Sequence, residues 1–534
     1  MEMEIKKLSY LKEIFIFVWK GVLYMLISLS SSTLLTLFFM ALSASWLSGL
    51  LFLNARIPLR FVHIHIGIAA LPSLVSLLAL VNNNGDRVVG PWHLDTLAWL
   101  MAFFVLTIGL IIQRFSVRYL MGDRSYRKYF ALFTFTTSVS SVAWLSDDLR
   151  LMIICWGATL IGLVLLIGLN KGWKVVSEAT KISGYLFTLS WIALLSAIIW
   201  LFQITGQWQL TSVLMNENVA QYGTLERTAI NLLIILAVMI PAAQWPFQRW
   251  LIESAVAPTP VSAIMHAGLV NAGGVMLTRF SPLFHDDIAQ IILLIFSSIS
   301  VLIGTGISLV QVDYKRQLVG STIAQMGFML IQCALGAYLA AIIHLILHGL
   351  FKATLFLQAG SSVERFGVVK QSNEKMSNLW IIVGRVLGLF IAITFWFITS
   401  GEGYQLVSAL ILGWSLYFSW KQLVVFGEGR MGRIAGLIVL IGFSLIYFTV
   451  HNSLYKWLHT DIYQSVQPSV PAVIFVICIL LFSSAISTFV TRNQSSTLFA
   501  VLYLWLVRVG EARRKSVESH PSYLKHYVSK GGNS

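Results

Sequence analysis

The chain has 534 residues, of which 57% are hydrophobic and only 11% are charged. Soluble domains carry about 25% charged residues, so this composition excludes an ordinary soluble protein. The formal net charge of +15 would suggest a nucleic-acid partner for a soluble protein, but basic loops on one side of a membrane explain it, and no nucleic acid is expected. Apolar stretches of roughly 20 residues recur along the chain, which predicts an all-α polytopic membrane protein.

In chain order, the apolar stretches predict fifteen membrane-spanning helices. Their ranges are 24–53, 61–82, 96–119, 128–146, 148–169, 182–203, 228–247, 259–280, 288–310, 316–336, 338–361, 378–399, 404–425, 432–451 and 470–491. Residues 13–53 could also hold two helices, split near the serines at 30–32, which would make sixteen. The N-terminus lacks a short apolar core followed by a small-residue cleavage site, so no cleaved signal peptide is predicted.

Lys and Arg residues are distributed unevenly over the loops of this arrangement. The loops on one side, together with the C-terminal tail, carry 26 of them, whereas the opposite loops carry five. Because cytoplasmic loops are enriched in Lys and Arg, the basic side and the C-terminus are expected in the cytoplasm.

Two neighbouring predicted spans contain prolines that interrupt helices. The first reads AVMIPAAQWPFQRW, with Pro241 and Pro246, and the second begins APTPVSAIMHAG, with Pro258 and Pro260. Proline inside a span frees backbone carbonyls, which is tolerated where protein or water satisfies them. A broken helix that lines a transport path and a simple kink both fit this pattern.

The span 338–361 carries three ionisable residues in the stretch HLILHGLFKATLF. His344, His348 and Lys352 are spaced by four, which predicts a stripe roughly 12 Å long on one helix face, here called the ladder. Histidine gains and loses a proton near neutral pH, so the ladder suits proton relay, although neutral, hydrogen-bonded histidines are the alternative. HLILH lacks the glutamate of HExxH and a third ligand, so no metal site is predicted.

Other ionisable residues lie within predicted spans or at their ends. They are His266, Arg385, Glu402 and Glu253, together with Asp313, Lys315 and Arg316 at a cytoplasmic helix start, where a solvated charge cluster is the alternative.

Residues 427–432, GEGRMG, match the glycine pattern of dinucleotide sites but follow no strand, so no cofactor is predicted. No catalytic constellation lies in a soluble segment, so the chain is not expected to be an enzyme.

Three stretches carry long motifs: AQWPFQRWLIESAVAPTPVSAIMHAGLVNAGGVML, VDYKRQLVGSTIAQMGFML and AAIIHLILHGLFKATLFLQAGS. Over about residues 92–365, the chain resembles the antiporter-like proton-pumping subunits of respiratory complex I. The resemblance implies about 14–16 transmembrane helices with two inverted five-helix repeats, each containing a broken helix. It divides the chain into N-terminal membrane helices (1–91), an antiporter-like core (92–425), C-terminal membrane helices (426–492) and a basic cytoplasmic tail (493–534).

The resemblance also implies roles for individual positions. It matches His266 and the ladder to the central proton-relay residues of the family, and Pro246 to the break of the first broken helix. Pro241 lies in the same broken helix. Glu253, Asp313, Lys315 and Arg316 also match family positions. Glu402 and Arg385 are expected to belong to the proton or cation relay: Glu402 would replace a missing exit group, and Arg385 would set the electrostatic potential around it.

Departures from the family pattern are as informative as the matches. Members usually have a glutamate after the tryptophan of the fifth helix and a lysine before the first helix break, where this chain has Gly157 and Pro241. The distal lysine after the second break is also replaced, by a segment with Glu402 and Gln405. The chain also ends soon after residue 491. These features favour the stand-alone relatives of the DabB type.

The DabB type is the membrane subunit of a two-component inorganic carbon transporter of the bacterial cell (inner) membrane. The resemblance implies that the chain conducts H⁺ or Na⁺ down its gradient. This flow would drive bicarbonate formation by a soluble, zinc-containing, carbonic-anhydrase-like subunit of the DabA type, to which any zinc would belong. Two alternatives stay open: a subunit of complex I or of a multisubunit Na⁺/H⁺ antiporter, and a non-conducting membrane anchor.

Overall fold

The computed structural model describes residues 29–82, 85–170, 172–284, 288–361, 378–398, 429–459, 470–492 and 496–512, with single positions between 406 and 420 and at 462. The chain divides into two compact units, one of residues 1–169 with 208–210 and one of the remaining residues. Glu402 and the predicted second helix break near it lie outside the described residues.

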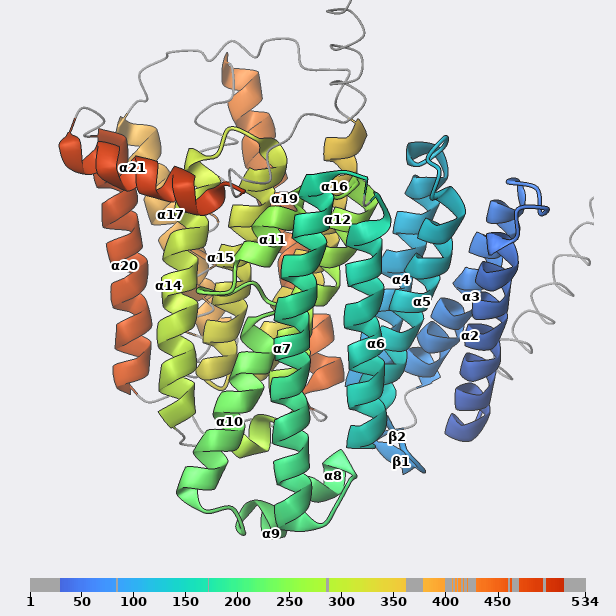
Figure 1. Cartoon of the computed structure of the whole chain (residues 1–534). Coiled ribbons are helices and arrows are strands. Elements are labelled where there is room, and N and C mark those ends of the chain that lie inside the picture. Colours follow the sequence, from blue (N-terminus) through green and yellow to red (C-terminus); the bar gives the residue numbers. More distant parts are fainter. Residues whose placement is uncertain are drawn as a thin grey trace, which may run out of the picture. The chain divides into compact units, whose positions relative to one another are not determined.

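The described part of the first unit contains five long helices and a short hairpin (Figure 1). These are α2 (Ser31–Leu53), α3 (Phe61–Asn82), β1 (Arg87–Val89), β2 (Trp92–Leu94), α4 (Thr96–Tyr119), α5 (Tyr126–Leu145) and α6 (Leu149–Ile167). The strands pair antiparallel, with Arg87 opposite Leu94. Side-chain caps set several helix starts, since the side chains of Ser30, Asp95 and Asp148 accept hydrogen bonds from the first-turn amides of α2, α4 and α6.

The second unit contains the other helices (Figure 1). They are α7 (Lys174–Thr205), α8 (Leu210–Val213), α9 (Asn216–Val219), α10 (Thr224–Met239), α11 (Arg249–Glu253), α12 (Thr259–Ala267), α13 (Ala272–Arg279), α14 (Ile288–Val310), α15 (Tyr314–Ala334), α16 (Tyr338–Ser361), α17 (Asn378–Ile398), α19 (Gly429–Leu458), α20 (Val470–Arg492) and α21 (Thr497–Gly510). Short 3-10 turns occur at Gly168–Asn170, Ser254–Val256, Leu269–Asn271 and Ser281–Phe284.

The prediction of a helical, multi-pass membrane protein is confirmed. Within the described ranges, nine helices are long and apolar enough to cross a membrane. α5 and α15 have 20 and 21 residues but carry more polar side chains. Four predicted ranges, 61–82, 96–119, 288–310 and 338–361, coincide with helices of the structure.

The predicted span 228–247 is a broken helix. α10 ends at Met239 and the chain turns through residues 240–248, which contain Pro241, Pro246 and the cis peptide bond between Trp245 and Pro246. A proline leaves the carbonyl four residues before it without its helical donor. The Ser190 hydroxyl donates to Ala237 O at 2.7 Å, and Gln244 Nε2 donates to Ala242 O at 2.8 Å. Both freed carbonyls therefore have side-chain donors.

The predicted span 259–280 is interrupted as well. α12 ends at Ala267, the 3-10 turn Leu269–Asn271 (η3) follows, and α13 begins at Ala272. This interruption places Asn271 inside the protein with 1% of its surface exposed. Its amide Nδ2 donates to Ala267 O at 2.7 Å, which satisfies a carbonyl at the end of α12 and fixes the orientation of the amide.

Helices α14 and α15 pack closely through glycines. A Cβ at Gly304 would lie 2.5 Å from Ala324 N, and a Cβ at Gly320 would lie 2.6 Å from Ser308 N. Small residues let helix backbones approach in membranes, where tight packing replaces the hydrophobic effect between helices. This contact fixes α15, which supplies several groups of the candidate site.

Helix α21 was predicted only as part of the basic tail. It lies across the ends of α14 and α20 (Figure 1), with Gly306 of α14 facing Leu506. Gln311 Nε2 donates to Val507 O at 3.4 Å. Its 14 residues are too few to cross a membrane, which is why a search for long apolar stretches passes over it.

Candidate functional site

The ladder lies on the buried face of α16. Lys352 is 2% exposed and His348 6% exposed, while His344 is half-buried. The rings of His344 and His348 are 6.1 Å apart between centroids. The spacing of four thus places the three groups in one row inside the protein, as predicted.

Two amide side chains from other elements face the ladder histidines. His344 Nδ1 lies 3.1 Å from Gln332 Oε1 of α15, and His348 Nδ1 lies 3.2 Å from Asn271 Oδ1 of η3. An amide oxygen only accepts hydrogen bonds, and the bond from Asn271 Nδ2 to Ala267 O fixes which atom is the oxygen. The hydrogen of neutral His348 therefore sits on Nδ1, and Nε2 is left as a proton acceptor. His348 Nε2 is buried and has no hydrogen-bond partner among the described residues.

His266, at the end of α12, joins the same region. Its ring stacks on Phe356 of α16, with centroids 4.2 Å apart, and its Nδ1 lies 3.0 Å from Thr322 Oγ1. The Thr322 hydroxyl donates its hydrogen to Leu318 O at 2.9 Å, so its oxygen accepts from His266 Nδ1. His266 therefore also carries its hydrogen on Nδ1.

Lys352 ends the row, and its side chain contacts uncharged oxygen atoms. Its Nζ donates to Leu318 O at 3.0 Å and to Ser321 Oγ at 2.5 Å. No ion pair of Lys352 is found within the described ranges of the chain. Leu318 O thus accepts from both Lys352 and Thr322, which links the lysine to His266 through one carbonyl. Burying an amine without an ion pair costs desolvation free energy and lowers stability, so its presence here favours a functional role.

The other predicted charged residues have hydrogen-bond or ion-pair partners of their own. Asp313 is the N-cap of α15, and its carboxylate accepts from Arg316 N at 3.0 Å. Lys315 Nζ donates to Ala257 O at 3.0 Å. Glu253 is 1% exposed and lies 3.5 Å from Arg249 Nε. The contact between the Asp313 carboxylate and Arg316 N is therefore a helix cap.

The remaining predicted positions have different surroundings. Pro241 and Pro246 lie in the turn between α10 and α11. The Arg385 side chain is exposed on α17, and Glu402 lies outside the described residues. The structure adds Asn271, Gln332 and Thr322, which sequence reasoning did not select. Their signal was a polar side chain inside an apolar segment, but many such residues only join helices.

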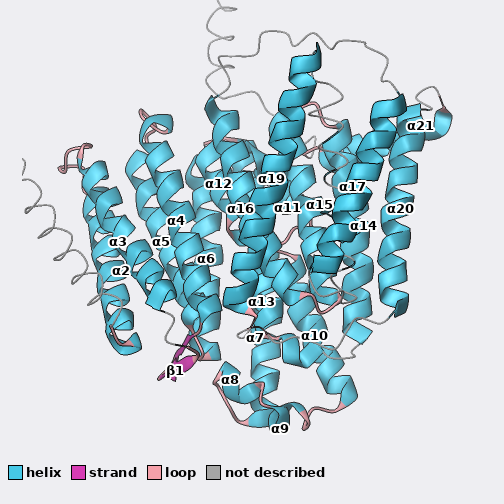
Figure 2. Cartoon of the chain, turned by 180° about the vertical axis from the view of Figure 1, so that it is seen from behind, coloured by secondary structure: helices cyan, strands magenta, loops and turns pink. Residues whose placement is uncertain are grey.

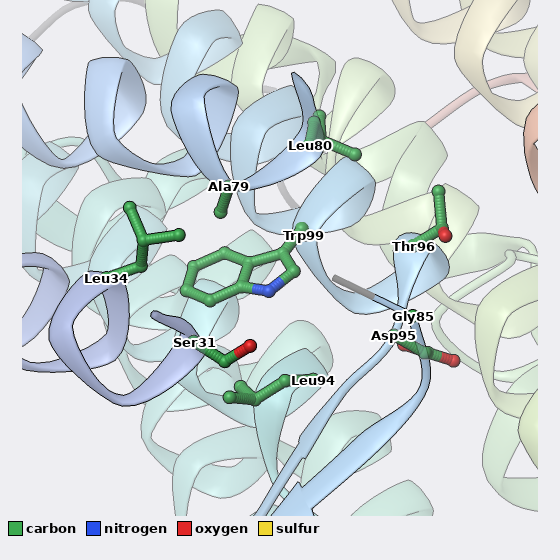
Figure 3. Close-up of a pocket in the computed structure, with 9 residues that line it drawn as sticks. All are labelled: Ser31, Leu34, Ala79, Leu80, Gly85, Leu94, Asp95, Thr96 and Trp99. Carbon is green, nitrogen blue, oxygen red and sulfur yellow. The ribbon is translucent and has the colours of Figure 1, made fainter. Parts of the chain in front are cut away.

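No group of three or more His, Cys, Asp or Glu residues that could hold a metal ion is present in the described part of the chain. A small pocket of about 20 Å³ lies in the first unit, at the end of α4, where Trp99 is flanked by Leu34 and Ala79 (Figure 3). Asp95 lines this pocket, but its carboxylate accepts from Ala98 N at 2.8 Å and caps α4. The ladder therefore remains the candidate site.

The sequence matches the family model "NADH:quinone oxidoreductase/Mrp antiporter, TM" over residues 146–432, more than half of the chain. The chain belongs to this family of antiporter-like membrane subunits. Residues 90–130 also match the model "NADH-Ubiquinone oxidoreductase (complex I), chain 5 N-terminus". The predicted family resemblance is confirmed.

Within the antiporter-like family, the chain is similar to the "Probable inorganic carbon transporter subunit DabB" of Bacillus anthracis. The two are 94% identical over 510 residues, which cover 96% of this chain and 100% of the relative. The protein of the same description from Bacillus subtilis (strain 168) is 71% identical over 505 residues, covering 95% of this chain and 100% of the relative. The DabB-type resemblance is thereby confirmed.

Two solved structures share the fold. A chain of the Mrp complex from Dietzia sp. DQ12-45-1b matches with a TM-score of 0.63 and 21% identity, covering 93% of this chain and 59% of that chain. A chain of the membrane-bound sulfane sulfur reductase, an archaeal respiratory membrane complex, matches with a TM-score of 0.58 and 16% identity, covering 90% of this chain and 98% of that chain. At these identities the likeness concerns the fold alone.

Proposed function

We propose that this chain is the membrane subunit of an energy-coupled inorganic carbon uptake complex of a bacterial cell membrane. It conducts H⁺ or Na⁺ down its gradient and thereby drives a soluble, zinc-containing, carbonic-anhydrase-like partner of the DabA type. The family and the printed descriptions of the relatives support the carbon-transport context. The single observation that carries conduction is the ladder of two histidines and one lysine inside the protein, with the buried His266 beside it.

The ladder residues and His266 pass protons between them. Each of His266 and His348 holds its hydrogen on Nδ1 against an oxygen and offers Nε2 as an acceptor. Gln332 holds His344 in the same way. Lys352 exchanges a proton at Nζ beside Ser321 and Leu318. Nitrogen acceptors of this kind suit a proton better than a hard cation, which prefers oxygen ligands.

The architecture supports a path through the membrane. Two interruptions of the helical backbone accompany the ladder. One is the break between α10 and α11, with Pro241 and Pro246, and the other follows α12. We place this broken helix in the first of two inverted five-helix repeats, within a total of 14–16 transmembrane helices. The uneven distribution of Lys and Arg over the loops favours a cytoplasmic C-terminus.

The test uses the full chain purified with its soluble partner and reconstituted into liposomes. An imposed pH gradient should give proton flux in the wild type and none in His348→Ala or Lys352→Ala, while both variants still assemble. In cells, the same variants should lose bicarbonate uptake. Full flux and uptake in both variants would contradict the relay. The co-purified partner should contain zinc. Co-purification of several small membrane subunits without a zinc protein would indicate an antiporter complex instead.

A further inference from the structure

A second row of protonatable rings lies on α19 and on the residue that follows it, outside the ladder. Tyr447, His451, Tyr455 and His459 follow at intervals of four residues and are here called the α19 file. Their successive ring centroids are 5.9, 6.4 and 5.8 Å apart. The oxygen of a phenol both donates and accepts a hydrogen bond, and an imidazole can accept a proton at one nitrogen and release one from the other. Each member can therefore pass a proton on and keep its net charge.

The file runs from a packed region to an exposed end. Phe395 of α17 packs on His451, with centroids 5.0 Å apart, and on Tyr447 at 6.0 Å. His451 is 8% exposed, whereas His459 is exposed at the end of the helix. His451 Nδ1 is buried and has no hydrogen-bond partner within the described ranges. Burying such an atom is unfavourable, so packing alone does not account for a histidine here.

The position of α19 relates the file to the ladder. α19 contacts α16, the helix that carries the ladder (Figure 2). Its first turns carry Arg430 and Arg433, and the loop charges place this end in the cytoplasm, so His459 lies at the outer end. Ions that move inward down their gradient start from the outer side.

We propose that the α19 file is the outer route by which protons reach the α16 ladder. This inference rests on the proposed function. Rings about 6 Å apart transfer protons through a bridging water or a side-chain rotation. The file supplies a route that does not need the glutamate and lysine replaced here by Gly157 and Pro241.

The test measures proton flux with a pH-sensitive dye in liposomes that contain the full chain and its co-purified partner. His451→Phe keeps a ring of similar size but cannot carry a proton, and it should slow flux at least about tenfold. The double variant Tyr447→Phe with Tyr455→Phe keeps both rings and should also slow flux. Tyr503→Phe, a tyrosine of α21 outside the file, and His63→Phe, in the first unit, are the matched controls and should keep wild-type flux.

Each outcome decides the matter. Wild-type flux in His451→Phe, with none in His348→Ala, overturns the α19 route and leaves the ladder relay standing. Wild-type flux in His348→Ala as well overturns the proposed function itself. If His451→Phe does not assemble, the tyrosine double variant decides: slow flux supports the route, and full flux overturns it.

Discussion

His348 and Asn271 are 77 residues apart in sequence, and their Nδ1 and Oδ1 atoms lie 3.2 Å apart. Asn271 occupies this place only because the helix is interrupted between α12 and α13. The amide is itself fixed by its bond to Ala267 O. The interruption therefore does more than bend a helix, because it supplies the oxygen that determines which nitrogen of His348 carries the hydrogen.

Asn271→Leu should slow proton flux roughly tenfold, because a hydrogen bond to a group that becomes charged is worth about 1.5–3 kcal/mol. Flux per assembled complex in liposomes measures this. Asn231→Leu is the matched control, since Asn231 is equally buried and donates to Leu283 O, away from the ladder. It should lower thermal stability but keep flux per complex. Equal flux loss in both variants would argue against a specific role for Asn271.

Lys352→Met should abolish flux without lowering the thermal unfolding midpoint. The two acceptors of Lys352 keep other partners, because Leu318 O still accepts from Thr322 and the Ser321 hydroxyl donates to Leu318 O at 3.0 Å. Replacing a buried charged group by an apolar one of similar shape is often neutral or stabilising. Thermal unfolding in detergent and flux in liposomes, measured on one preparation, check both parts. A large drop in stability would mean that Lys352 has a structural role.

Gly320→Val should reduce both assembly and flux. Its Cβ would collide with backbone atoms of α14, which cannot move aside as a flexible side chain can. The resulting displacement of α15 would carry Ser321 and Thr322 away from Lys352 and His266. Gly442→Val is the matched control, since a Cβ there meets nothing within 4 Å. Size-exclusion profiles and flux should be close to wild type for Gly442→Val only.

Asp148 should make the first unit sensitive to acid. Its hydrogen bond with Arg150 lowers the pKa of the carboxyl from the ordinary value of 3.8. Its stabilising effect is therefore complete above about pH 4 and is lost as the pH falls below that value. Asp148→Ala should cost about 1 kcal/mol at neutral pH, whereas Asp148→Asn keeps the cap and should cost less. Thermal unfolding between pH 3 and 7, roughly the range of carboxyl titration, should show convergence of wild type and Asp148→Asn in acid.

Local signals predicted much of the fold. α3 and α14 match their predicted ranges because apolar runs end at polar residues, and α2 begins at the serines that allow residues 13–53 to hold two helices. The ladder followed from a spacing of four on one helix. Pairings across the chain carry no such signal: Gln332 and Asn271 are ordinary polar residues until folding places them against His344 and His348. The side chains that donate to the free carbonyls at the α10 break, Ser190 and Gln244, could not be predicted either, because these contacts depend on how the chain folds around the break.

The shared arrangement of His266 and His348, with hydrogen on Nδ1 and an oxygen opposite it, has a consequence for the proposed relay. Asn271 Oδ1 accepts the hydrogen bond of His348 Nδ1 but cannot take its proton, and the amide cannot turn because Ala267 O holds it. In the proposed relay, His348 would therefore receive and release each proton at the same atom, Nε2. The proton donor and the proton acceptor would have to reach Nε2 in turn, so such a site would pass one proton per exchange of partners and would prevent a continuous leak without a separate gate.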